Sequence, residues 1–201
     1  MYVSTFPASK HVPEAVSSTD SGQTLSPDET VSPEHVRARA LPLRKRPVDI
    51  VFVCFFSLFI VTCVISDSIP TLGIPQTAHT SNLFAQWNYT YSSLNDPLYE
   101  NPPIWLRFIT GTSAFIYLPF YVVLVISLVR GWNWIQLPSV IYATMIISLT
   151  AIPIFGVEFF GDAAQRTPHP VTFLLYNGAY VLVPLLLLIR MRKPRPFDRK
   201  F

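Results

Sequence analysis

Residues 94–105 read Leu-Asn-Asp-Pro-Leu-Tyr-Glu-Asn-Pro-Pro-Ile-Trp, and they lead directly into a long apolar segment. A second polar feature lies upstream, where the apolar run at 51–66 ends on Asp67. An acid at the end of a hydrophobic segment needs a structural or chemical role, because a charge is costly to desolvate at membrane depth. We therefore expect the chain to be organised around these acids, at the mouth of a pocket between helices.

The composition is typical of a membrane protein. Of the 201 residues, 50% are hydrophobic and only 13% are charged, whereas soluble domains carry about 25% charged residues. Four apolar segments reach the roughly 18 residues that a membrane-spanning helix needs, at 48–66, 104–129, 136–160 and 171–191. The sequence thus predicts an all-α integral membrane protein, a bundle of four transmembrane helices with kinks and a central pocket that opens toward the lumenal half.

Three regions are expected along the chain. Residues 1–47 are rich in Ser, Thr, Pro and Glu and predict a disordered tail; residues 48–191 hold the membrane domain, and 192–201 form a basic tail. Basic residues flank the outer ends of the first and last spans and the connection between the second and third: Arg37, Arg39, Arg44, Lys45, Arg46, Arg130, Arg190, Arg192, Lys193, Arg195, Arg199 and Lys200. By the positive-inside rule both termini are then cytosolic. These residues are not interleaved with aromatics, so we do not expect nucleic-acid binding.

Polar side chains inside the spans gather in the half nearer Asp67. The set is Thr112, Ser113, Tyr117, Thr150, Glu158, Asn177 and Tyr180, with Tyr142 placed deeper. Taken singly, each is more typical of helix packing than of ligand contact. Their shared depth favours a pocket, and so do the internal prolines, which remove backbone donors and predict kinks at Pro119, Pro138, Pro153 and Pro184.

The acids have alternative interpretations. Asp67 is either an interfacial acid that ends the first helix or a pocket acid that pairs with a cationic or hydroxylic ligand. Asp49 is expected at the cytosolic edge of the first span, where water and Arg46 make its charge inexpensive. Asp96 stands before a proline, which suits a cap or a turn. We therefore expect Asp96, Pro102 and Pro103 to form a structural clasp that turns the loop into the second helix.

Other chemistry leaves few signals. The four histidines are scattered and no nucleotide-binding or metalloprotease motif occurs, so no metal, cofactor or catalytic residue is expected. Cys54 and Cys63 lie nine positions apart on one helix, too far for a disulfide. Asn88-Tyr89-Thr90 matches the N-glycosylation sequon, which is a weak hint of a glycan on Asn88.

The ordered motifs of the chain resemble a known family. They are D-P-L-Y-E-N-P-P-I-W at 96–105, L-P-F-Y at 118–121, W-I-Q-L-P-S-V-I-Y at 134–142, A-I-P-I at 151–154 and A-Y-V-L-V-P at 179–184. This set is similar to the EXPERA-domain membrane proteins, and within them to the sigma-2 receptor branch rather than the sterol-isomerase branch of emopamil-binding protein. The resemblance covers about residues 48–194.

The resemblance implies a four-helix protein of the endoplasmic reticulum whose pocket binds sterols or cationic amphiphiles. It implies that Asp67 pairs with a ligand amine, that Asp96 is structural, and that Tyr142, Thr150, Asn177 and Tyr180 belong to the pocket, which Ser113 and Tyr117 join by their depth. Two departures concern catalysis. Ser113 stands where the family has a second-span glutamate, and Cys63 and Asp67 stand where the isomerases have His and Glu.

These implications lead to a ranked expectation of function. The first is a non-enzymatic binder of sterols or cationic amphiphiles, in contact with membrane lipids and acting in sterol homeostasis or trafficking. One alternative is a sterol isomerase that uses Asp67 and Glu158 as an acid–base pair. Another is a chaperone-like partner of a larger sterol-transport membrane protein. A homodimer is also considered.

Overall fold

The computed structural model describes residues 40–198, and within them every regular element is helical. Residues 1–39 and 199–201 of the predicted tails lie outside this range and stay predictions, whereas residues 40–47 and 192–198 are described. Three continuous helices are long and apolar enough to cross a membrane: Pro47–Thr71, Ile104–Arg130 and Asn133–Phe160. A fourth span is a bent pair, Pro170–Asn177 and Ala179–Arg190, with 44° between its halves. This confirms the prediction of a helical membrane bundle.

The spans are made of shorter elements. The first contains α1 (Pro47–Thr62), a π-helical turn (Cys63–Asp67) and α2 (Ser68–Thr71). The second contains α5 (Ile104–Thr112), a π-helical turn (Ser113–Tyr117) and α6 (Leu118–Arg130). The third contains a 3-10 turn (Asn133–Ile135), α7 (Gln136–Met145), a π-helical turn (Ile146–Ala151) and α8 (Ile152–Phe160). The fourth contains α9 (Pro170–Asn177) and α10 (Ala179–Arg190).

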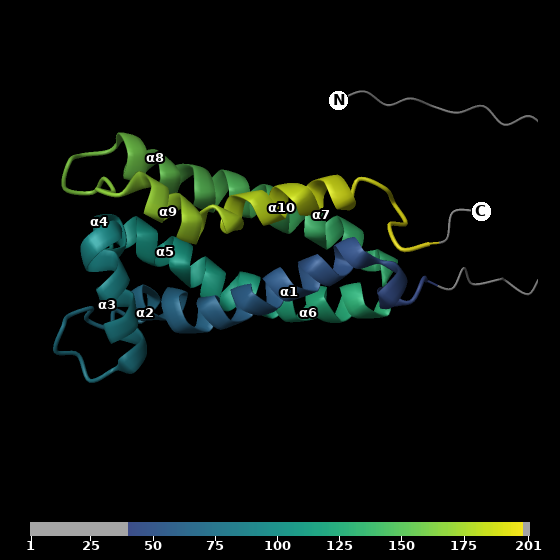
Figure 1. The fold of residues 1–201 in the computed structure, drawn as a ribbon, viewed down its shortest axis with the longest axis horizontal. Coiled ribbons are helices and arrows are strands. Elements are labelled where there is room, and N and C mark those ends of the chain that lie inside the picture. The colour runs from purple at the N-terminus through teal and green to yellow at the C-terminus, as the bar shows by residue number, and fades with distance from the viewer. Residues whose placement is uncertain (1–39, 199–201) are drawn as a thin grey trace, which may run out of the picture. The chain divides into compact units, whose positions relative to one another are not determined.

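The first two spans are joined by two further helices, α3 (Leu83–Asn95) and α4 (Pro97–Glu100). Figure 1 shows α3 and α4 beside α2 and α5, whereas the start of α1 and the ends of α6 and α10 lie at the opposite end of the bundle. Within the bundle α1 packs on α6, and α7 packs on α10. We call the end with α3 and α4 the cavity end, and the other the Asp49 end.

Proline explains the three π-helical turns. Pro70, Pro119 and Pro153 each follow such a turn by two or three residues. A proline has no N–H and its ring clashes with the carbonyl four residues earlier, so the preceding turn widens. Pro138 and Pro184, the other two predicted kink sites, are not preceded by a π-helical turn. Pro138 lies in the first turn of α7, where its N–H is not needed, and the fourth span bends at Gly178 rather than at Pro184.

Aromatic rings fill the middle of the bundle. Phe56 contacts Tyr121 and Tyr142, with ring centroids 5.6 and 6.0 Å apart. The Tyr142 hydroxyl donates a hydrogen bond to the Tyr121 hydroxyl at 3.2 Å. Phe59 stacks on Tyr180 at 4.5 Å. These interlocking rings pack the middle of the bundle, between the Asp49 end and the cavity end.

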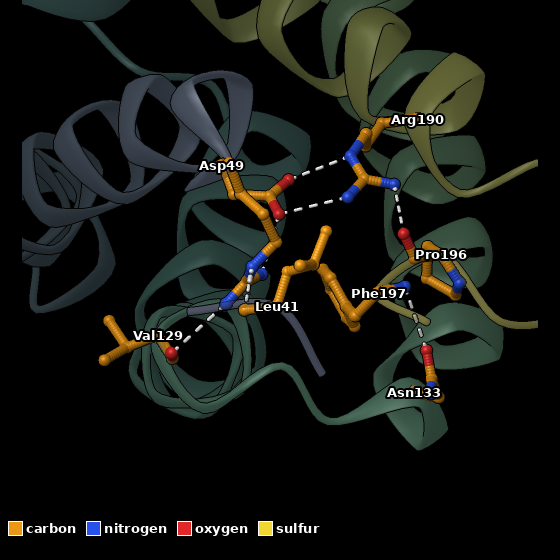
Figure 2. Close-up of polar contacts among 8 residues, drawn as sticks. Leu41, Asp49, Val129, Asn133, Arg190, Pro196 and Phe197 are labelled. Atoms are coloured by element: carbon orange, nitrogen blue, oxygen red, sulfur yellow. Dashed lines mark hydrogen bonds and ion pairs between the residues drawn. The ribbon is translucent and has the colours of Figure 1, made fainter. Parts of the chain in front are cut away.

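Asp49 departs from the sequence-based expectation. Its side chain is 0% exposed, so water does not solvate it. Instead it accepts hydrogen bonds from Arg46 Nη1 at 2.7 Å and from Arg190 Nε and Nη2 at 2.8 and 3.0 Å. Figure 2 shows the Arg190 guanidinium facing both carboxylate oxygens. The expectation of a solvated edge position is wrong, because the last turn of the fourth span closes over Asp49.

Candidate ligand-binding site

A cavity of about 330 Å³ lies at the cavity end, and all four spans together with α3 and α4 contribute to its wall. The wall coincides with the places where the spans depart from regular α-helix. Ser66 and Asp67 come from the first π-helical turn, Ser113 from the second and Thr150 from the third, and the bend at Gly178 separates Asn177 from Tyr180. Widened or bent helices cannot pack tightly against each other, so the cavity forms at their common depth.

Asp67 is the charged group of the first span in this wall. Its carboxylate interacts with the side chains of Cys63 and Ser113. Both can donate to a carboxylate, and neither carries a compensating charge. Within residues 40–198 no Lys, Arg or His forms an ion pair with Asp67. A carboxylate facing a cavity under these conditions attracts a cation or a strong donor supplied by a ligand.

Asp67 does not end the first helix, which was one of the two interpretations of the sequence. It closes the π-helical turn, and α2 continues to Thr71. Pro70 leaves the carbonyl of Ser66 without its helical donor. The Tyr99 hydroxyl and the Asn88 amide donate to that carbonyl instead. The helices α3 and α4 thereby satisfy the backbone that the proline opened.

Asn88 is consequently not placed to carry a glycan. It is buried, accepts a hydrogen bond from Ser66 Oγ at 3.0 Å and donates to the carbonyl of Ile65 at 3.3 Å. A sugar on its amide nitrogen would break these bonds and would have to enter the cavity. The glycosylation predicted from the sequon is incompatible with this arrangement.

Tyr99 adds a second hydroxyl near Asp67. Burial raises the pKa of the Tyr99 phenol well above its ordinary value, and the charge of Asp67 raises it further. The phenol therefore stays protonated and remains a donor. Tyr99, Trp87 and Tyr91 line the cavity and were not among the residues predicted from the sequence. The sequence signal for Trp87 and Tyr91 is the run of aromatic residues at 84–91, but such a run is equally typical of the membrane interface.

The remaining predicted residues divide into two groups. Ser113, Thr150, Asn177 and Tyr180 line the cavity. The Tyr180 hydroxyl donates to Thr62 Oγ1 at 2.6 Å, and Asn177 Nδ2 donates to the Tyr91 hydroxyl at 3.0 Å.

Tyr117 and Tyr142 belong to the aromatic core instead of the cavity wall. The tyrosine that lines the cavity is Tyr121, which also belongs to the aromatic core. Tyr121 follows Tyr117 by four residues, so the two side chains lie on one helix face. The tyrosine of the L-P-F-Y motif could therefore have been predicted as a cavity residue.

Asp96 is the N-cap of α4 and also reaches the cavity wall. Its Oδ1 accepts a hydrogen bond from the amide of Tyr99 at 2.9 Å. Burial raises the pKa of Asp96, and interactions with Glu158 and with the Tyr99 amide partly offset that rise. Two carboxyl groups in contact can hydrogen-bond only when they share a proton. Neither carboxyl oxygen of the buried Glu158 has a hydrogen-bond partner within residues 40–198, so we propose that Asp96 and Glu158 share one proton.

Pro102 and Pro103 complete the turn into the second span. The carbonyl of Pro103 accepts from the amides of Leu106 and Arg107, which starts α5, and the Pro102 carbonyl accepts from Arg107 Nε at 3.3 Å.

Glu158 does not meet Asp67. It is 1% exposed, interacts with Asp96 and is not part of the cavity wall. The isomerase alternative assumed that Asp67 and Glu158 form the acid–base pair, but in the structure Glu158 interacts with Asp96 instead. Within residues 40–198 no three His, Cys, Asp or Glu side chains are grouped as a metal site.

Comparison with known proteins gives the family. Residues 83–191 match the family model described as EBP, EXPERA (EXPanded EBP superfamily). The chain is 27% identical over 150 residues to "Sigma intracellular receptor 2" of Xenopus tropicalis, which covers 71% of this chain and 85% of the frog protein. It is 29% identical over 107 residues to the proteins of the same name from Macaca fascicularis and Homo sapiens, covering 48% of this chain and 60% of each of them. The chain therefore belongs to the EXPERA family, in its sigma-2 receptor branch.

Proposed function

We propose that this protein is a non-enzymatic receptor that holds an amine-bearing amphiphile or a sterol in the cavity between its four spans. The observation that carries the proposal is the carboxylate of Asp67, which faces the cavity with a thiol and a hydroxyl as partners and without a cation from the described residues. A bound ammonium group would supply that cation. A sterol would supply a hydroxyl donor at the same place.

The shape and lining of the cavity suit such a ligand. Small-molecule sites occupy about 300–1,000 Å³ and combine apolar walls with a few polar groups, and this cavity has about 330 Å³. Leu106, Ile109, Ile146, Ile154 and Phe155 supply apolar surface for the body of an amphiphile. The ring of Tyr121 supplies an aromatic face, which attracts a cation as well as a ring system.

The finer parts of the proposal concern cellular place and role. The relatives carry the name "Sigma intracellular receptor 2", which supports ligand binding inside the cell. We place both termini in the cytosol, because basic residues gather at the Asp49 end. The endoplasmic-reticulum membrane is the location that the resemblance to the sigma-2 receptor branch implies. Sterol homeostasis, and work beside a sterol-transport membrane protein, are roles that fit a membrane-embedded sterol receptor.

The test is binding of a tritiated lipophilic tertiary amine to the purified full-length protein in detergent. Asp67→Asn keeps the size of the side chain but removes its charge, so amine affinity should fall strongly. Asp162→Asn is the matched control, because Asp162 is exposed and lies outside the cavity wall. Full amine affinity in the Asp67→Asn protein would refute the role of Asp67. Cholesterol should compete with the amine, and absence of competition would limit the site to amines.

A further inference from the structure

A second hollow lies at the Asp49 end, on the outer surface between α1 and α10. It is a groove of about 700 Å³ that shares no residue with the cavity near Asp67. Val48, Val51 and Phe55 form one apolar wall, and Leu186 and Ile189 form the other. All five side chains are exposed. Because they lie on the membrane-spanning segments, the neighbours of this surface are lipid chains.

The end of the groove is strongly basic. Arg190, Arg192, Lys193 and Arg195 line it, and the acid that lines it with them is Asp198. Asp198 lies 3.7 Å from Arg195 and also accepts a hydrogen bond from Asn133 Nδ2. The rim therefore has an excess of positive charge. It adjoins the end of a membrane span, which is the depth at which lipid phosphates lie.

The rim is held in place by contacts of the segment that follows α10. Arg190 Nη1 donates to the carbonyl of Pro196 at 2.9 Å, and the Phe197 amide donates to Asn133 Oδ1 at 3.1 Å, as Figure 2 shows. The Phe197 ring is buried, and the guanidinium groups of Arg46 and Arg190 lie 5.0 and 5.2 Å from its centre. Asp49 fixes both arginines from the other side. The folded segment thus presents Arg192, Lys193 and Arg195 at a set position.

We propose that this groove binds an anionic phospholipid. Its headgroup phosphate lies at Arg192, Lys193 and Arg195, and one acyl chain lies between α1 and α10. The basic rim selects a lipid with net negative charge over a zwitterionic one, because each basic residue near such a headgroup attracts its negative charge. The apolar walls select a lipid over a soluble phosphate ester.

The experiment is native mass spectrometry of the purified full-length protein in detergent, titrated with phosphatidylserine or with phosphatidylcholine of the same chain length. We expect phosphatidylserine adducts to persist at about tenfold lower lipid concentration than phosphatidylcholine adducts. The double change Arg192→Gln with Arg195→Gln should remove at least about tenfold of that preference. The control is Arg44→Gln with Lys45→Gln, which removes the same charge from the same end at exposed positions outside the groove.

A second variant tests the apolar half of the site. Val51→Trp fills the groove from an exposed position of α1, so it should weaken phosphatidylserine and phosphatidylcholine adducts together without lowering the unfolding temperature. Equal losses in the two double variants would overturn the proposal, since they would mean general charge attraction. Persistence of adducts in Val51→Trp would also overturn it, and so would a lipid-independent dimer that the same variant abolishes.

Discussion

Two aspartates of the first span illustrate the two ends of the molecule. Asp49 is completely buried, yet it has three hydrogen bonds from two guanidinium groups. Asp67 faces a cavity and has a thiol and a hydroxyl beside it. The difference teaches that function is indicated by an acid's partners rather than by its burial. An acid whose charge is matched inside the fold stabilises the fold, whereas an acid that lacks a cation is available to a ligand.

The backbone also differs between the two ends: it is regular around Asp49 and distorted around Asp67. Around Asp49 the first span is regular α-helix and packs on α6 against an aromatic core. Around Asp67 each of three spans has a π-helical turn and the fourth is bent. Regular helices interlock and leave no room, whereas widened ones separate. In the interior of the bundle, tight packing and charge pairing therefore occur together around Asp49, and a cavity and a carboxylate without a described cation occur together around Asp67.

The largest effect is expected from Asp49→Ala. Removing one member of a buried ion pair leaves the other charges uncompensated, which costs about 3–5 kcal/mol of folding free energy. The unfolding temperature in detergent should fall strongly. Asp162→Ala, at an exposed position, is the matched control and should leave it nearly unchanged. A small change in unfolding temperature in Asp49→Ala would mean that Asp49 does not stabilise the fold and so does not differ from Asp67 in this respect.

The next effect concerns Asp67, whose removal should weaken ligand binding without lowering stability. Asp67→Asn should weaken binding of a lipophilic amine by about 2–3 kcal/mol, the contribution of a charge-assisted hydrogen bond. The unfolding temperature should stay the same or rise, because a carboxylate without a cation is removed. Binding and unfolding are measured on the same preparation, and a large loss of stability would show that Asp67 is structural like Asp49.

A smaller effect tests how the cavity end is supported. Tyr99→Phe removes the hydroxyl that donates to the Ser66 carbonyl, which Pro70 leaves without a helical donor. The Asn88 amide still donates to this carbonyl, so the loss is that of one hydrogen bond, about 0.5–1.5 kcal/mol, and the unfolding temperature should fall moderately. Tyr176→Phe is the control, since Tyr176 is exposed and its contact is a ring contact with Tyr91. Equal stability of the two variants would contradict the bracing role of α3 and α4.

The sequence predicted the spans well, because a long apolar segment has few alternatives to a helix that crosses the bilayer. It predicted kinks from prolines, but Pro138 shows that a proline in the first turn has no such effect. The bend at Gly178 follows no proline. Local rules recognise which residues can distort a helix, while packing determines which of them do.

Long-range partners were beyond local reasoning. Asp49 and Arg190 are 141 positions apart, and no spacing rule joins them. Asn88 matched a glycosylation sequon, yet its amide satisfies the π-helical turn of another segment. Asp67 was identifiable because an acid after an apolar run is conspicuous in any sequence. Trp87, Tyr91 and Tyr99 were not identifiable, because an interfacial aromatic and a cavity aromatic have the same local pattern.

The smallest effect concerns the shared proton of Asp96 and Glu158. Burial raises the pKa of Asp96 in the folded chain. The folded state then holds this proton more tightly than the unfolded one, so the contribution to stability is complete below the unfolded pKa of about 3.9 and is lost as the pH rises through the folded value. The unfolding temperature in detergent should therefore be lower at neutral pH than at mildly acidic pH.

Glu158→Gln tests this carboxyl pair directly. The amide offers Asp96 a permanent N–H donor and carries no titrating proton. Stability at neutral pH should change by less than about 1 kcal/mol, and its dependence on pH should become shallower. Glu100→Gln is the control, because Glu100 is partly exposed on α4 and its side chain has no hydrogen bond to residues 40–198; it should keep the wild-type slope. A wild-type slope in Glu158→Gln would mean that the two carboxyl groups titrate independently. Asp96 would then resemble Asp67, an acid that the fold leaves to the cavity, instead of Asp49, an acid whose charge the fold matches.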